Sequence, residues 1–221
     1  VTVDVAGSKA TDAAGNNNTA ARQATQAVDT AAPTTPTIAT ITTPGNDSTP
    51  TITVTAEAGS TVKVYADGDL LAGTLTESSG TFTFTPSALP DGSYSITATA
   101  TDTTGNVSAE ATPQIVEIDA VQAGVPVISS ASLTTDTTPT ISGTAEVGST
   151  VKVTLGGGGN TSTWNVTATN GTWSIDTSTT ATSTVGSGHT IATNGTNAVS
   201  VTATDAAGNV SSAGTQTLTV D

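Results

Sequence analysis

The sequence repeats itself, and this repeat limits the possible folds more than any other feature. The stretch TPTITVTAEAGSTVKV at residues 49–64 returns as TPTISGTAEVGSTVKV at residues 138–153, which is 89 residues later. A second motif, TDTTGNVS at 101–108, has near-copies that begin at Thr11 and Thr204. A fixed period of this kind is the signature of a tandem array of structural units. We therefore predict the C-terminal part of a preceding unit at 1–31, a complete unit at 32–120, and a complete unit with loop insertions at 121–221.

Apolar residues alternate with Thr and Ser through most of each unit, which is the pattern of half-buried β-strands. Branched Thr and Val side chains suit a pleated surface, and no stretch shows helical periodicity. In the first complete unit the alternation predicts seven strands, at 37–41, 51–56, 61–66, 70–75, 81–85, 93–101 and 112–118. The expected fold is all-β: tandem immunoglobulin-like β-sandwiches, seven-stranded and of Greek-key connection, arranged end to end.

The few aromatic residues add detail about the two cores. Tyr94 stands at the start of the sixth predicted strand, where immunoglobulin domains place a tyrosine corner. A half-buried Tyr without a specific hydrogen bond is the alternative. Trp173 takes the position of Phe82 and is predicted to be a core residue, whereas Trp164 has no counterpart in the first complete unit and is predicted to pack.

Composition excludes several kinds of partner and site. Eighteen Asp and Glu residues against four Lys and Arg give a net charge of -14, which disfavours nucleic acid and anionic membrane surfaces and favours a divalent cation. The absence of Cys excludes disulfides and thiolate metal sites. No apolar stretch is long enough for a membrane span, and no signal peptide is visible. The first residues resemble the middle of a strand, so we expect a fragment of a longer protein.

The chemistry of an enzyme is missing from the sequence. The single His, His189, lies in an insertion of the last unit and is predicted to be a solvated loop residue. No phosphate-binding loop, zinc spacing or dinucleotide fingerprint is present, and the aromatic residues are too few to wall a sugar-cleaving cleft. Lys63 and Lys152 recur at matched positions; they could form an isopeptide bond with Asn, but strand alternation places them on the solvated face.

Several of these motifs together resemble a known family. TPTISGTAEVGSTVKV, NGTWSI, TATDAAGNVS and the linker VDTAAP at 28–33 are similar to the bacterial immunoglobulin-like repeats of giant adhesins exported by type I secretion, the RTX-type surface adhesins of biofilms. The resemblance implies calcium-dependent, rod-like extender arrays that hold a distal binding domain away from the cell. The second linker, IDAVQAGVP, departs from the family pattern, and the GGxGxD calcium repeats of the secretion signal are absent.

Strand order predicts where the acidic turns meet. In a sandwich that the chain enters at the top, the loops after the second, fourth and sixth strands return to the top. Glu57, Glu77 and Asp102 then lie together, and the entering linker adds Asp29. The same construction groups three acids at the second junction: Asp119, Glu146 and Asp205.

Clustered carboxylates without a cation raise one another's pKa and destabilise the fold. Calcium takes six to eight hard oxygen ligands in flexible geometry, so the hypothesis is a Ca²⁺ site at each junction. Asp102 and Asp205 would be ligands, Glu57 and Glu146 would complete the shell, and Asp29 and Asp119 would connect the neighbouring unit. The alternative is that TDxxGN is only a turn, with Asp accepting backbone hydrogen bonds. A second acidic set lies on the opposite loops: Asp47, Asp67, Asp69, Asp91 and Asp136. Within it, the stretch ADGD at 66–69 could bind an ion, but an Asp-Gly hairpin turn needs none, and the turn is the favoured interpretation.

The predicted function is a non-catalytic spacer on the bacterial cell surface, for adhesion or biofilm formation. Its partners would be the neighbouring repeats of the same chain, in a monomeric rod, with any glycan or protein ligand bound elsewhere in the parent protein. A rival hypothesis is a ligand-binding module that uses the insertions of the last unit, at 156–160 and about 177–197, with Trp164 and His189. A third is an accessory domain of a surface enzyme.

Overall fold

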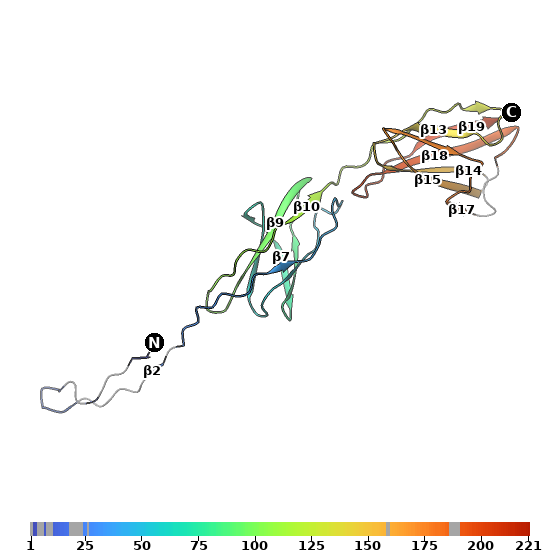
Figure 1. Cartoon of the computed structure of the whole chain (residues 1–221). Helices are drawn as coiled ribbons and strands as arrows, with labels where there is room; N and C mark the ends of the chain where they lie inside the picture. Colours follow the sequence, from blue (N-terminus) through green and yellow to red (C-terminus); the bar gives the residue numbers. More distant parts are fainter. Residues whose placement is uncertain are drawn as a thin grey trace.

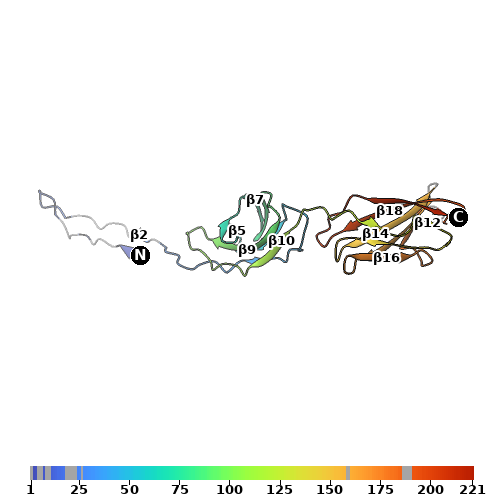
Figure 2. The same ribbon diagram turned by 90° about the horizontal axis from the view of Figure 1, so that it is seen from above.

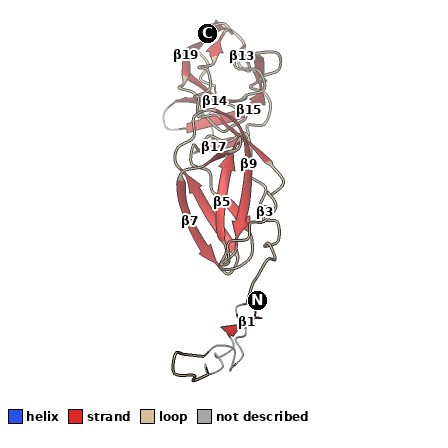
Figure 3. Ribbon diagram, turned by 90° about the vertical axis from the view of Figure 1, so that its left-hand side faces the viewer, coloured by secondary structure: helices blue, strands red, loops and turns tan. Residues whose placement is uncertain are grey.

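The computed structural model describes residues 2–3, 7, 11–17, 24–25, 27–157, 160–185 and 191–221. The regular structure of these residues consists of strands, with no helix among them (Figure 3), and none of them therefore belongs to a helix that could cross a membrane. Two β-sandwiches follow one another along the chain and are joined by an extended linker (Figures 1 and 2). The prediction of an all-β tandem array of immunoglobulin-like sandwiches is confirmed.

The first sandwich consists of two four-stranded sheets, so it has eight strands and not the seven that were predicted. One sheet has the order β3-β4-β8-β7, with strands Thr37–Ile38, Ile52–Thr55, Thr81–Pro86 and Gly73–Ser78. The other has the order β10-β9-β5-β6, with strands Gln114–Ile118, Gly92–Thr101, Thr61–Ala66 and Asp69–Leu70. All neighbouring strands are antiparallel.

Inward-facing residues of both sheets form one core. Ile52, Val54, Phe82 and Ile96 are almost completely buried, while the Thr residues between them face outward or lie at the rim. Burying a side chain of this size stabilises the fold by roughly 1.5–3 kcal/mol. The alternation of apolar and Thr residues therefore builds the sandwich directly, because each strand turns every second side chain into the core.

The predicted strand at 70–75 is wrong, because it covers parts of two strands in different sheets. A tight turn at Asp67 and Gly68, with φ of 52° and 89°, returns the chain as the short strand β6. The chain then crosses to the other sheet and pairs β7 with β8. Gly73 permits this crossing, since a Cβ at that position would overlap the backbone carbonyl of Thr85.

The second sandwich divides its strands differently. A three-stranded sheet has the order β11-β13-β16, with strands Val127–Ile128, Thr140–Thr144 and Thr172–Asp176. A six-stranded sheet has the order β12-β19-β18-β14-β15-β17, with strands Leu133–Thr134, Gly214–Val220, Gly195–Thr204, Thr150–Gly157, Asn160–Thr167 and Ser183–Val185. Trp164 and Trp173 both lie in its core, so both tryptophan predictions are confirmed.

In both sandwiches the entering segment runs parallel to the last strand. β12 pairs in parallel with β19, and Gly45 forms a parallel bridge to Ile118. Around that bridge, the Gly45 amide donates to the Glu117 carbonyl at 3.0 Å, and the Asp119 amide donates to the Gly45 carbonyl at 3.0 Å. Two segments that run in the same direction begin at the same end, so the chain enters each sandwich at one end and leaves at the other (Figure 1).

The segment before the first sandwich contains the short antiparallel pair β1 (Thr2–Val3) and β2 (Ala24–Thr25).

Two smaller predictions about the sandwiches are confirmed. The Tyr94 hydroxyl donates to the Pro90 carbonyl at 2.8 Å, which is a tyrosine corner. Lys63 and Lys152 lie on the exposed face of their strands.

Candidate functional site

The three copies of the TDxxGN motif fold into the same turn. In each, the Gly amide donates to the Asp carbonyl, at 3.0 Å for Gly15, 3.3 Å for Gly105 and 3.3 Å for Gly208. These glycines have φ of 82°, 95° and 94°, a region that residues with a Cβ rarely adopt. The repeated Gly is therefore required by the backbone of the turn.

The repeated Asp holds this turn together from inside. Asp102 Oδ1 accepts the amides of Thr104 at 2.8 Å and Asn106 at 2.9 Å, and Oδ2 accepts the Asn106 side-chain amide at 2.8 Å. The hydrogen bond from the Asn106 side chain is the largest cause that lowers the Asp102 pKa to about 2. The same bond from Asn16 lowers the pKa of Asp12. Hydrogen bonds stabilise the ionised form of each carboxylate.

Asp205 occupies the same place in the second unit. Its desolvation raises the pKa, but the hydrogen bonds from Asn209 and from the backbone of the turn outweigh it, so the pKa lies below the usual value. Oδ1 of Asp205 accepts the Asn209 amide at 2.9 Å, and Oδ2 accepts its side-chain amide at 2.9 Å. In all three copies of the motif, the Asp therefore has the role that the turn interpretation gives it, which is to accept hydrogen bonds within the turn.

In the two complete units, the Asn of the motif connects the turn to the linker that precedes the unit. Asn106 Nδ2 donates to the Asp29 carbonyl at 3.3 Å, and Asn209 Nδ2 donates to the Asp119 carbonyl at 2.9 Å. Sequence reasoning concentrated on the acids and missed these two residues. The signal was present, because Asn recurs four residues after Asp in every copy of the motif.

The final Ser of the motif was also missed. Ser108 and Ser211 are buried, and their hydroxyls accept the amides of Ala100 at 3.0 Å and Ala203 at 2.9 Å. Each hydroxyl also donates to the carbonyl of the following residue at 2.8 Å. An unpaired buried amide costs about 1–3 kcal/mol, so this Ser allows the chain to leave the long strand without losing a hydrogen bond.

The six predicted site residues lie at the two junctions. Asp29, Glu57 and Asp102 line one hollow of about 290 Å³ at the first junction, and no Lys or Arg is part of its lining. At the second junction, Asn209 bonds to both Asp119 and Asp205, and Glu146 Oε2 lies 3.5 Å from the Gly124 amide. Glu77 accepts the Gly80 amide at 3.1 Å and does not line the first hollow.

The sequence profile of the bacterial Ig-like domain matches residues 40–120 and 127–221. The chain belongs to this family. The two matched stretches contain the whole second sandwich and all of the first except β3, so each sandwich is a bacterial Ig-like unit. No curated protein sequence matches the chain.

Several solved structures align with much of the chain. Fibronectin(III)-like modules of Clostridium thermocellum CbhA align over 82% of this chain and 93% of their own length, with 16% identity and a TM-score of 0.49. A biofilm-associated protein, in a structure of its BSP domain, aligns over 84% of this chain and 29% of its own length, with 22% identity and a TM-score of 0.31. The titin domains z1z2, in complex with telethonin, align over 84% and 96%, with 14% identity and a TM-score of 0.29.

The junctions of the Ig-like units fit calcium in the kind of ligand they offer. Carboxylates and backbone carbonyls are the hard oxygen donors that Ca²⁺ takes. Asp102 has limited capacity, since its Oδ1 accepts two backbone amides and the Thr104 hydroxyl, while its Oδ2 accepts only Asn106. Within the ranges that the structure describes, no three acidic or His side chains converge as a ready-made metal site.

The opposite loops use their acids to shape the backbone. Asp47 and Asp136 accept the amides of Thr49 at 2.8 Å and Thr138 at 2.9 Å. Asp67 accepts the amide of Ser95, and Asp91 accepts the amide of Ala120, each at 2.9 Å. All four acids therefore accept backbone hydrogen bonds within turns and loops. The Asp67 bond and the strand position of Asp69 in β6 agree with the interpretation of 66–69 as a hairpin turn.

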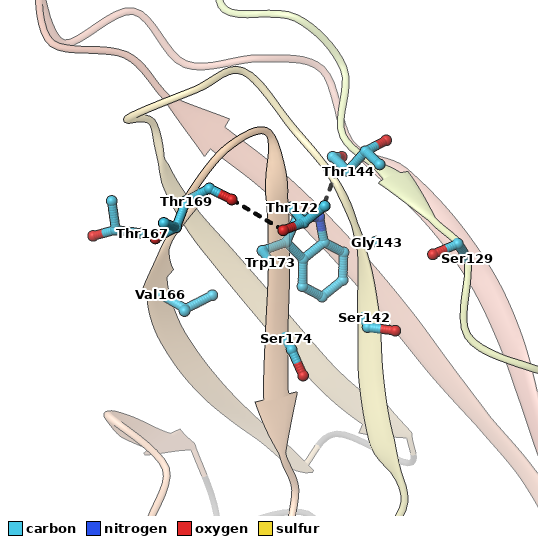
Figure 4. A pocket seen from close by; sticks show the side chains of 10 residues that line it. All are labelled: Ser129, Ser142, Gly143, Thr144, Val166, Thr167, Thr169, Thr172, Trp173 and Ser174. Atoms are coloured by element: carbon cyan, nitrogen blue, oxygen red, sulfur yellow. Dashed lines mark hydrogen bonds between the residues drawn. The ribbon is translucent and has the colours of Figure 1, made fainter.

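A second hollow, of about 490 Å³, lies beside Trp173 and is lined largely by Ser and Thr (Figure 4). Trp173 is only 3% exposed, and its Nε1 donates to the Thr144 carbonyl at 3.2 Å. Trp164 is 7% exposed, and its Nε1 donates to the Thr179 carbonyl at 3.3 Å. Neither indole presents a free face for stacking on a sugar. His189, the other residue of the rival hypothesis, lies outside the described residues.

Proposed function

We propose that these Ig-like units are spacer repeats of a large bacterial cell-surface adhesin, stiffened by calcium at their junctions. The observation that carries the spacer role is the parallel pairing of the entering segment with the last strand in each unit. Units that the chain enters and leaves at opposite ends add length with every repeat. A repeated, non-catalytic unit of this kind projects whatever domain lies beyond it.

The charge of the chain supports a need for cations. A net charge of -14 makes neighbouring units repel one another, and salt largely screens this repulsion only between charges more than about 8–10 Å apart. Calcium bound at a junction would neutralise part of this charge and join the linker to the unit that follows. The ligands proposed are Asp29, Glu57 and Asp102 at the first junction, and Asp119, Glu146 and Asp205 at the second.

Calcium would also restrict stiffening to the outside of the cell. Extracellular modules bind Ca²⁺ with dissociation constants of about 10⁻⁴–10⁻³ M, which is far above the cytosolic concentration. The units would then rigidify only after export. This fits the resemblance to RTX-type adhesins of type I secretion, with the chain as a monomeric rod whose partners are its own neighbouring repeats.

The test is a thermal melt in millimolar Ca²⁺ and in chelator, at an ionic strength matched with Na⁺. At 100 times the dissociation constant, binding stabilises the folded state by about 2.7 kcal/mol. Glu57→Gln is the informative variant, because the 57–60 loop is held through the Glu57 carbonyl, which accepts the Ser60 amide at 3.1 Å and hydroxyl at 2.7 Å. We expect Ca²⁺ to raise the melting temperature and Glu57→Gln to reduce that rise.

Asp69→Asn is the matched control, since it removes one charge from a hairpin strand that does not line the junction hollow. It should leave the calcium effect unchanged. An identical melting curve in Ca²⁺ and chelator would remove calcium from the proposal. The spacer role would then rest only on the observation that the chain enters and leaves each unit at opposite ends.

A further inference from the structure

Asp119 is bonded to both Ig-like units at once. Its amide donates to the Gly45 carbonyl of the first unit at 3.0 Å, and its carbonyl accepts the Asn209 side chain of the second unit at 2.9 Å. Its own carboxylate accepts the Val121 amide at 3.1 Å and shapes the linker. One linker peptide therefore has fixed positions relative to both neighbours.

Both side-chain N–H donors of Asn209 have acceptors at this contact. A side-chain amide has two N–H donors; Asn209 Nδ2 has two acceptors, the Asp205 carboxylate at 2.9 Å and the Asp119 carbonyl at 2.9 Å. Because the carboxylate is ionised and fixed by the turn, it orients the amide toward the linker.

The first junction has the same parts and one additional acceptor. Asn106 Nδ2 lies 2.8 Å from Asp102 Oδ2, 2.9 Å from the Thr104 hydroxyl and 3.3 Å from the Asp29 carbonyl. Three acceptors compete for two hydrogens, and the linker carbonyl is the most distant. In the second unit the position of Thr104 is taken by Ala207, which has no hydroxyl, and the linker bond is shorter.

Ala207 also lies against the preceding unit. It lines a hollow together with residues 44–47 of the first unit, and a Cβ on the adjacent Gly208 would lie 3.6 Å from Asn46 Nδ2. The second junction has another direct bond, from Gln122 Nε2 to the Val210 carbonyl at 2.8 Å. Ala32 holds the place of Gln122 in the first linker and has no such donor.

We infer that the Asn of the TDxxGN turn is a latch that sets the angle between neighbouring units, and that the residue two positions before it tunes the latch. Ala at that position leaves both amide hydrogens for the carboxylate and the linker, whereas Thr diverts one of them. The latch deepens the proposed spacer function and rests on it, but it does not require calcium. The sequence of the turn at each junction then determines how stiff the rod is at that junction.

The test measures the distance between the two units directly. The chain contains no Cys, so Lys63→Cys and Lys152→Cys, on exposed strand positions, place one spin label on each unit. Pulsed electron paramagnetic resonance in chelator gives the distribution of distances between the two labels across the second junction. We expect a narrow distribution in the otherwise unchanged chain, a broad one with Asn209→Ala, and an intermediate width with Ala207→Thr.

Asn106→Ala is the matched control, because it removes the same side chain at the other junction. It should leave the measured width unchanged. Circular dichroism and a thermal melt check that each variant is folded; should Asn209→Ala unfold the second unit, an unchanged width with Ala207→Thr overturns the latch and the tuning together. An unchanged width in a folded Asn209→Ala chain would overturn the latch, and an unchanged width in Ala207→Thr would overturn the tuning. Repeating the measurement in Ca²⁺ keeps a failure of the calcium proposal separate from a failure of the latch.

Discussion

The two Ig-like units contain the same motifs, yet the segment after β5 in the first unit and the segment after β14 in the second unit join different sheets. In the first unit this segment makes the short strand β6 and then crosses to pair β7 with β8. In the second unit the whole segment stays beside β14 as β15. The side chains of the segment explain which sheet it joins. In the second unit Trp164 lies directly opposite Val153 and is buried with it, which keeps β15 beside β14. In the first unit Gly73 lets β7 approach β8 closely.

A second difference concerns one pair of facing core positions. Val54 is paired with Phe82 in the first unit, and Gly143 is paired with Trp173 in the second. The larger ring is matched by the loss of the opposite side chain, so the total volume is nearly kept. Related repeats can therefore change individual core residues when the partner changes with them.

The largest expected effect concerns Trp164, the buried tryptophan of β15. Trp164→Ala should destabilise the second unit by about 3–5 kcal/mol, because it empties a large buried site, and it should leave the first unit unchanged. Hydrogen exchange of the backbone amides of β14 and β5 reports the two units separately. Equal loss of protection in both units, or none in β14, would contradict the role of Trp164 as the residue that keeps β15 on its sheet.

The exchanged core pair gives the next effect. Gly143→Val should cost about 3 kcal/mol, because overpacking a filled core forces side chains and backbone to move; a Cβ there would lie 2.7 Å from Trp173 Cζ2 and would overlap the Val127 carbonyl. Adding Trp173→Phe recreates the pair of the first unit and should recover part of this loss in chemical denaturation. Val54→Gly with Phe82→Trp is the matched exchange in the first unit. Additive effects of the two substitutions would mean that the positions are not coupled.

The buried Ser tests a feature that the units share. Ser108→Ala and Ser211→Ala should each cost about 1–3 kcal/mol in denaturant unfolding, because the amides of Ala100 and Ala203 lose their acceptor in a buried place. Ser212→Ala, on an exposed neighbouring position, serves as the control and should be nearly neutral. A clear effect in one unit only would show that the two turns are not equivalent.

The smallest effect is the acid dependence of the turn. The Asp102 pKa is lowered to about 2 in the folded chain, below the value of about 3.9 in an unfolded chain. A lowered pKa adds stability above about pH 4, and this stability is lost as the pH falls toward 2. Unfolding midpoints from pH 5 to pH 2 should therefore fall less steeply for Asp102→Asn than for the original chain. Asp205→Asn should act in the same direction, since the Asp205 pKa is also lowered; a steeper fall in either variant would contradict the sign.

The sequence by itself determined the all-β class, the tandem arrangement and the acidic turns, because period-2 alternation and repeated Gly-Asn turns are local signals that neighbouring residues carry. It also predicted the tyrosine corner at Tyr94, the core tryptophans and the outward lysines, since alternation decides which face of a strand a residue occupies. Only the tertiary structure decided which sheet receives the segment after β5 or β14, because that depends on packing against residues distant in sequence. The tertiary structure likewise assigned the Asn106 and Asn209 amides to the linker carbonyls of Asp29 and Asp119. These partners lie 77 and 90 residues away along the chain, and no local pattern specifies a contact over such a separation.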